Sequence, residues 1–231
     1  MGRAVGLALM ARGFDLAFSA RGSRGALEQT AAAIDALGGC ARVYDADLRQ
    51  PQACRALVEQ ATGWRGRLDV LVCLASVFER VAFDDLTPET WREHLAVDLD
   101  ASFHCAQAAA AAMREASRGH IVLSTDWVAA SGRPRYAGYV PYFVAKAGVV
   151  ALTQALALEL APHHIQVNAV APGPIVPAAG TGPGQQAAVM AATPLGRWGT
   201  PDALAHTIGM LVDSTFVTGE VVRVDGGRHL T

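Results

Sequence analysis

The 231-residue sequence lacks three features: a long apolar run, a run of basic residues and a metal-ligand spacing of cysteines. No stretch of about 18 uninterrupted apolar residues and no basic-then-apolar leader is present, so we expect no membrane partner. Scattered basic residues and a net charge of −2 argue against a nucleic-acid partner. The four cysteines lie in apolar or helical surroundings, which predicts reduced thiols in a cytoplasmic protein: Cys40, Cys54, Cys73 and Cys105. The seven histidines form no ligand cluster, so no metal is implied.

Apolar residues make up 52% of the chain and charged residues 17%, which is enough for one α/β domain over residues 1–231. Strand-like runs alternate with helical ones. The predicted strands are 15–20, 41–44, 68–74, 120–125, 165–170 and 220–224; the predicted helices are 1–13, 23–37, 51–62, 88–113, 142–161 and 201–212. Such alternation favours a parallel sheet covered on both faces, the doubly wound arrangement. Residues 176–192, rich in Gly, Pro and Ala, are predicted to form a substrate lid.

A tyrosine and a lysine lie four residues apart, Tyr142 and Lys146, at the start of a long apolar run. On a helix this spacing places both side chains on one face, one turn apart. An ammonium beside a phenol favours the phenolate and lowers its pKa. The phenol then becomes a usable proton donor or acceptor near neutral pH. The same spacing also occurs by chance on surface helices, so the residues around the pair matter.

A strand-like run precedes this pair, and a second run follows it and ends in Pro172-Gly173. Together these features resemble the short-chain dehydrogenase/reductase family, over essentially the whole chain. The resemblance implies a Rossmann-like fold and a nicotinamide dinucleotide, with Tyr142 as proton donor and Lys146 on the nicotinamide ribose. It also implies that Pro172 and Gly173 shape the nicotinamide pocket. The apolar helices at 91–113 and 149–160 would then join subunits into a homodimer or homotetramer.

The chain departs from the family pattern at its beginning. In the family, a strand and the turn Gly-x-x-x-Gly-x-Gly precede the first helix, and Gly2 matches only the last glycine. The turn places backbone N–H groups against the cofactor pyrophosphate. Either the natural product is longer, or the chain is truncated and cannot hold a dinucleotide in the usual way. Without the central strand, its two neighbours would stay unpaired or pair across a gap.

By the same resemblance, several residues contact the cofactor. Arg21 follows a strand where a guanidinium suits a 2′-phosphate, which predicts NADPH; a solvated arginine is the alternative. Asp47-Leu48 resembles the pair beside the adenine, although it could equally be the turn before the helix at 51. Ala75-Ser76 stands where the family has Ala-Gly, and it matches the Asn-Ala-Ser variant of pteridine reductases.

Two aspartates replace family residues at the predicted active site. Asp98 stands where an asparagine holds a water chain to the lysine, and an ionised carboxylate there can accept but not donate. Asp126 stands where most members place a serine that donates to the substrate carbonyl. Pteridine and dihydromonapterin reductases carry an aspartate here. Asp126 lies sixteen residues before Tyr142, which requires an insertion in 132–139; in another register Ser124 or Ser131 would be the donor.

Three functions follow from these residues. The first is NADPH-dependent reduction of a pterin-like C=N substrate, with Tyr142, Lys146, Asp126 and Asp98 as catalytic residues. The second is a carbonyl reductase of the same fold, for example on 3-oxoacyl substrates. The third belongs to another class: a non-catalytic binding or assembly module, suggested by the missing first strand.

Overall fold

The computed structural model describes residues 1–19, 21–22, 24–178 and 180–231. Three residues of the predicted elements lie outside these ranges. They are the last residue of the first predicted strand, the first residue of the second predicted helix, and one residue of the predicted lid: Ala20, Ser23 and Ala179.

The described strands are all parallel and form two sheets. In one, β1 (Leu16–Ser19) pairs with β2 (Ala41–Tyr44). The other has four strands in the order β3-β4-β5-β6, with bounds Val70–Val72, Gly119–Ser124, Ile165–Pro172 and Val221–Val224. Among the described residues no strand ladder joins β1 to β3. Over the described ranges, each of these two strands pairs with one neighbour only, β1 with β2 and β3 with β4.

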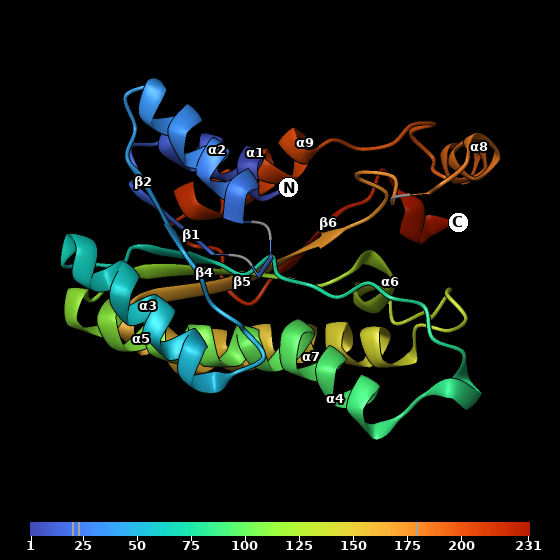
Figure 1. Ribbon diagram of the computed structural model, residues 1–231, viewed down its shortest axis with the longest axis horizontal. Helices are drawn as coiled ribbons and strands as arrows, with labels where there is room; N and C mark the ends of the chain where they lie inside the picture. The colour runs from blue at the N-terminus through green and yellow to red at the C-terminus, as the bar shows by residue number, and fades with distance from the viewer. Residues whose placement is uncertain (20, 23, 179) are drawn as a thin grey trace.

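Helices cover both faces of the strands (Figure 1). One face carries α1 (Gly2–Met10), α2 (Arg24–Ala36) and α9 (Pro201–Asp213). The opposite face carries α3 (Pro51–Arg65), α5 (Ala101–Ala116) and α7 (Val140–Leu160). The chain is therefore a single-domain, Rossmann-like α/β protein with parallel sheets, as predicted.

The residues of β4 show why this strand is central. Ile121 and Leu123 belong to the core cluster that includes residues of α3, α5 and α7. Val122 belongs to the cluster that includes residues of α1 and α9. Successive side chains of a strand point to opposite faces, so an unbroken apolar run fits a strand that is buried on both sides. The second cluster also contains Leu16 of β1, so side-chain packing connects the two sheets.

The 21-residue helix α7 packs one side against the sheet through Ala145, Val149 and Ala157. With the 3₁₀ turn that follows it, the helix is long and apolar enough, by length and composition alone, to cross a membrane. Buried core helices of soluble proteins have the same property. Val144 and Leu158, on the other side of α7, are exposed.

The predicted helix over 88–113 consists of three segments. It begins with α4 (Pro88–Leu95), passes through a π-helical turn (Ala96–Asp100) and continues as α5. A π turn adds a residue to the helical repeat and often occurs at functional sites. Here the turn contains Asp98, which is 1% exposed and therefore faces the interior.

Two short helices were missing from the sequence prediction. One is α6 (Trp127–Ala130), where Asp126 is the N-cap and its carboxylate accepts a hydrogen bond from the Val128 N–H at 2.7 Å. Aspartate is common at the N-cap because its side chain accepts a hydrogen bond from a backbone N–H that would otherwise be unpaired. The other is α8 (Pro183–Ala191), which shows that much of the predicted lid is helical.

Candidate active site

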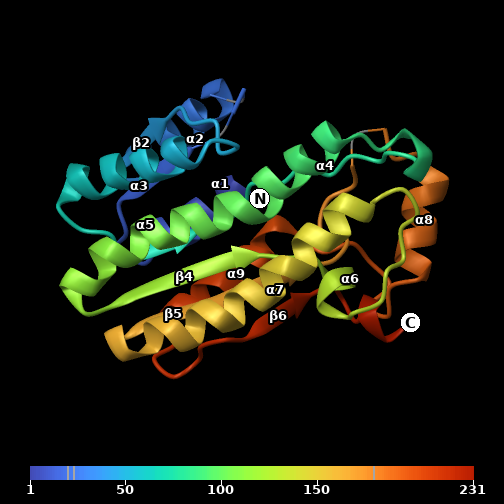
Figure 2. The same cartoon turned by 90° about the horizontal axis from the view of Figure 1, so that it is seen from below.

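The predicted site residues follow the carboxyl ends of the strands. Because β3 to β6 are parallel, their carboxyl ends meet at one edge of the sheet, where ligands of doubly wound proteins bind. Figure 2 shows α4, α6 and α8 gathered at this end of the four-stranded sheet. Ser76, Asp126 and Gly173 follow three of these strands, and Tyr142 is on the first turn of α7.

The Tyr142 hydroxyl donates a hydrogen bond to Oδ2 of Asp126 at 3.0 Å. The structure therefore places Asp126 beside Tyr142, in preference to the two serines that another register would have offered. Ser124 instead contributes its backbone carbonyl, which accepts from Lys146 Nζ at 3.0 Å. The Ser131 hydroxyl donates to the Trp127 carbonyl at 2.6 Å, within its own helical turn.

Lys146 and Asp98 form a buried ion pair, with 3.2 Å between Nζ and Oδ1 and side chains 3% and 0% exposed. Asp98 also accepts hydrogen bonds from the Ser76 hydroxyl at 2.5 Å and from the Val77 N–H at 3.2 Å. The structure thus joins Ser76, Asp98 and Lys146, which the sequence had placed on three separate elements. An ammonium has three donors, so one Nζ proton is still available after Asp98 and Ser124.

His94 lies next to Asp98, and the sequence analysis did not identify it as a site residue. Its side chain is 2% exposed, and Nδ1 is 3.7 Å from Oδ2 of Asp98, which is beyond hydrogen-bond distance. The two residues are four apart on α4 and the π turn, so helical spacing was a signal that could have found it.

The pKa values of the Tyr142–Asp126 pair differ from the expectation. Burial raises the pKa of the Tyr142 phenol, and the neighbouring Asp126 carboxylate raises it further. The predicted lowering by Lys146 is therefore wrong in this structure: burial and the nearer carboxylate outweigh an ammonium 5.8 Å from the ring centre. Burial also raises the pKa of Asp126, against the opposing effects of Val128, Tyr142 and Lys146. Both groups consequently hold their protons more tightly than they would in water.

At the end of β5, Gly173 is required by close backbone packing. Its N–H donates to the Val224 carbonyl at 3.0 Å, and an added Cβ would lie 2.5 Å from Cβ and 2.6 Å from Cα of Asp225. Pro172, half-buried, pairs with Val224 in the β5–β6 ladder. Both residues lie on the same edge of the sheet as Tyr142.

The predicted adenine-side residues are near one another. Arg21 is exposed, and its guanidinium lies 3.9 Å from both Asp47 and Glu93. Asp47 binds Arg49 more closely, and this hydrogen bond lowers the pKa of the carboxyl to about 2. Leu48 packs against the core, and its carbonyl accepts from the Cys54 thiol at 3.3 Å.

The residues present fit a nicotinamide dinucleotide. Gly2 begins α1 without a side-chain cap, and nothing lies within 4 Å of where its Cβ would be. The first N–H groups of a helix favour a phosphate. At the opposite end, Lys146 keeps a donor for a ribose hydroxyl. Ala75 is exposed beside Ser76 on the same edge.

Three aromatic side chains that the sequence analysis missed as a group pack beside the Tyr142 ring; we call Phe78, Tyr136 and Tyr139 the aromatic wall. Phe78 stacks on Tyr139 with 4.5 Å between ring centres and meets Tyr142 edge-on at 4.9 Å. The Tyr136 hydroxyl accepts from the Trp127 indole at 3.0 Å. Residues of this wall and Asp126 line a narrow cavity of about 10 Å³. The wall comes from an insertion and a loop after β3, segments with no periodic pattern to reveal it.

Comparison with known proteins gives consistent results. The family model described as enoyl-(acyl carrier protein) reductase matches residues 1–229. An uncharacterized oxidoreductase of Methylorubrum extorquens is 35% identical, over 98% of this chain and 92% of that protein. A 3-oxoacyl-[acyl-carrier-protein] reductase of Staphylococcus aureus is 30% identical, over 100% and 94%.

Solved structures agree as well. Acetoin dehydrogenase from Enterobacter cloacae has a TM-score of 0.87 and 35% identity, covering 99% of this chain and 90% of that one. A short-chain dehydrogenase/reductase from Serratia marcescens has a TM-score of 0.90 and 29% identity, covering 99% and 93%. The chain therefore belongs to the short-chain dehydrogenase/reductase family of oxidoreductases, which use a nicotinamide cofactor.

Proposed function

We propose that the protein is an NADPH-dependent reductase of a flat, pterin-like substrate with a C=N bond. The observation that carries the proposal is the hydrogen bond between Tyr142 and Asp126, at the place where most family members have a serine. An ionised carboxylate there accepts from a ring N–H, whereas it repels the oxyanion that develops during carbonyl reduction.

The cofactor supplies the hydride, and the residues of this chain manage the proton. Tyr142 supplies the proton to the reduced nitrogen, directly or through water, since its hydroxyl is the donor of the hydrogen bond in the site. Asp126 orients the ring by accepting its N–H and shares the proton with Tyr142. Lys146, held by Asp98, places its remaining donor on the nicotinamide ribose. Arg21 accounts for the NADPH preference, since a guanidinium suits a 2′-phosphate.

The aromatic wall supports a flat substrate. Phe78 packs against both Tyr139 and the ring of Tyr142, the proton donor. Aromatic side chains favour contact with planar rings. Residues 176–192, with α8, would cover the bound ring as a lid.

Carbonyl reduction is the second candidate, and one observation favours it. Burial raises the pKa of Asp126, and a protonated carboxyl can donate to a carbonyl oxygen as a serine would. The relative from Staphylococcus aureus is named for a 3-oxoacyl substrate. The hydrogen-bonded assembly of Tyr142, Asp126, Lys146 and Asp98 favours either enzyme over a non-catalytic module.

We further propose a cytoplasmic homodimer or homotetramer. The exposed apolar side chains of α5 and α7, Phe103, Val144 and Leu158, would meet their counterparts in a second subunit. Free thiols at the described cysteines agree with a reducing compartment.

Substrate choice tests the proposal. NADPH consumption is measured with a quinonoid dihydropterin and with a 3-oxoacyl thioester, using the wild type, Asp126→Ser and Tyr142→Phe. We expect the wild type to prefer the pterin, Asp126→Ser to shift toward the thioester, and Tyr142→Phe to lose about 10²–10⁴-fold with either. A wild type that reduces the thioester better than the pterin would replace the first candidate by the second.

A further inference from the structure

A second cavity, of about 290 Å³, lies outside the active site. Its lining comes from the turn after α6, the loop before α7, strand β6 and the C-terminal 3₁₀ turn: Ser131, Arg133, Arg223, His229 and Leu230. Three of these side chains are basic, and no carboxylate lines the cavity. None of them has a part in the proposed reduction.

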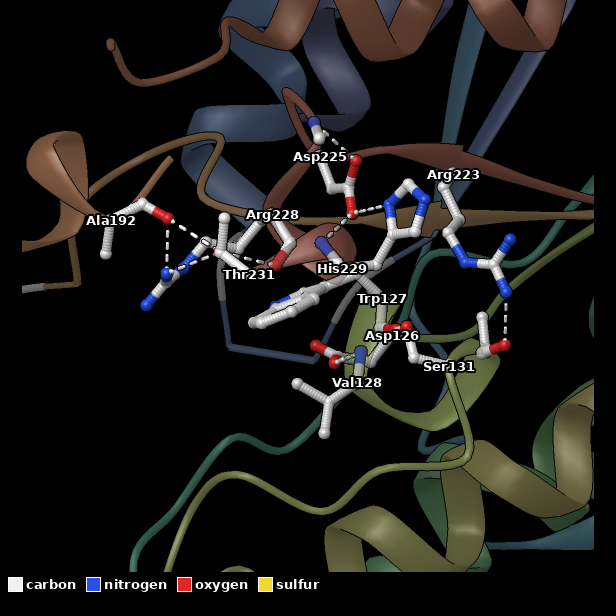
Figure 3. A network of polar contacts seen from close by, with 12 residues as sticks. Asp126, Trp127, Val128, Ser131, Ala192, Arg223, Asp225, Arg228, His229 and Thr231 are labelled. Atoms are coloured by element: carbon white, nitrogen blue, oxygen red, sulfur yellow. Dashed lines mark hydrogen bonds and ion pairs between the residues drawn. The ribbon is translucent and has the colours of Figure 1, made fainter. Parts of the chain in front are cut away.

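The His229 imidazole is held in a fixed orientation. Its Nδ1 lies 2.7 Å from Oδ2 of Asp225, a carboxylate whose side chain is only 4% exposed. The same oxygen accepts the His229 backbone N–H at 3.0 Å, and Oδ1 accepts the Gly227 N–H at 2.9 Å. Figure 3 shows the imidazole between Asp225 and the Arg223 side chain, so the edge carrying Nε2 is turned away from the carboxylate.

The two arginines are also placed without a carboxylate partner. Arg223 donates to the Ala130 carbonyl at the end of α6, at 2.5 Å. Within the described ranges, neither Arg223 nor Arg133 has a carboxylate oxygen within 4.0 Å. Asp225, a buried acid of this network, already accepts hydrogen bonds from the His229 ring and from the backbone N–H groups of Gly227 and His229. The charge of both guanidinium groups is therefore uncompensated at the cavity.

We propose that this cavity binds the phosphate group of a small phosphorylated molecule. Guanidinium groups match phosphate oxygens with paired N–H donors, and an imidazole N–H is a further donor type. The Ser131 side chain adds a polar group at the edge of the cavity, while Leu230 offers apolar contact to the organic part of the ligand. One water needs about 10–15 Å³ of such space, so a cavity of about 290 Å³ leaves room for an organic part.

The cavity shares no lining residue with the proposed catalytic group. Asp126 is the N-cap of the four-residue helix α6 and does not line the cavity, whereas Ser131, just after this helix, does. Tyr142, Lys146 and Asp98 do not line the cavity. The proposal consequently does not depend on which substrate is reduced.

Calorimetric titration of the full chain, without cofactor, tests the site. The probes are inorganic phosphate, phenyl phosphate and phenol at equal concentrations. We expect both phosphates to bind, phenyl phosphate more tightly, and phenol not to bind. Arg133→Glu and Arg223→Ala should each raise Kd at least tenfold, about 1.4 kcal/mol. Arg223→Lys should fall between these and the wild type, because it keeps the charge and loses the paired donors.

Arg55→Ala is the matched control, because Arg55 is an exposed arginine of α3 without an ion pair among the described residues. Its Kd should equal that of the wild type. Equal weakening by Arg55→Ala and Arg223→Ala would show a diffuse surface effect and overturn the proposal. Absence of phosphate binding to the wild type, or unchanged binding to the folded Arg133→Glu protein, would overturn it too. Arg133 lies in an exposed loop, so this variant is expected to fold.

Discussion

At the scale of single residues, the chemistry depends on a carboxyl and a phenol that share a hydrogen bond. Asp126 and Tyr142 both have raised pKa values, mainly because they are buried. A raised pKa in the folded state means that the protonated carboxyl is favoured on folding. The stability that Asp126 contributes is then fully present at low pH and is lost as the pH rises through the folded-state pKa.

Asp126→Asn should therefore raise the melting temperature at neutral pH and leave it unchanged below pH 3.8, the ordinary pKa of the carboxyl. The reason is that asparagine removes a buried charge that only forms at the higher pH. Thermal denaturation of both proteins across this pH range measures the difference. An equal melting temperature at every pH would contradict the burial of an ionised Asp126.

Asp98 gives a second prediction for a single residue. Asp98→Ala should lower the free energy of unfolding by about 3–5 kcal/mol, because Lys146 would be left as an uncompensated buried charge. Asp98→Asn should lower it less, because the amide oxygen still accepts from Ser76. Urea denaturation gives both values. If Asp98→Ala costs less than about 1 kcal/mol, the value typical of an exposed pair, the ion pair is not what holds the lysine.

At the scale of elements, the ends of β5 and β6 approach so closely that only glycine fits between them. Gly173→Ala should lower the free energy of unfolding by about 1–3 kcal/mol, since the new Cβ would overlap backbone and Cβ atoms of Asp225. Gly63→Ala is the control: it is in α3 and meets nothing within 4 Å, so it should stabilise by about 0.5–1 kcal/mol. An unchanged free energy of unfolding in Gly173→Ala would show that the end of β6 can move away from β5.

The elements also show what a sequence reveals and what it conceals. The i, i+4 spacing placed Tyr142 and Lys146 correctly because helix geometry is local. The π turn around Asp98 was missed because its residues have no distinct pattern. The direction of the Tyr142 pKa shift was wrong because it depends on burial and on Asp126, sixteen residues away, which only the folded chain brings into contact.

At the scale of the whole molecule, the parallel pairing of the strands was predictable from their alternation with helices. The aromatic wall and the second cavity were not predictable, because loops assemble them. Tyr136 and Arg133 come from the insertion before α7, and Phe78 from the loop after β3.

The break between the sheets should be visible in hydrogen exchange. Amides of β1 and β2 are expected to exchange faster than those of β4 and β5, because a two-stranded sheet is less stable than the buried centre of a four-stranded one. Mass spectrometry of peptides spanning these strands measures the rates. Equal protection of both sheets would mean that they open as one unit.

Cofactor binding tests the central claim most directly. Fluorescence titration of the protein with NADPH and with NADH should give a Kd at least tenfold lower for NADPH. The same titration of Arg21→Ala should remove most of that difference. Equal affinity of the wild type for both cofactors would contradict the proposed contact between Arg21 and the 2′-phosphate. Binding of neither cofactor would contradict the proposal that this protein is a reductase.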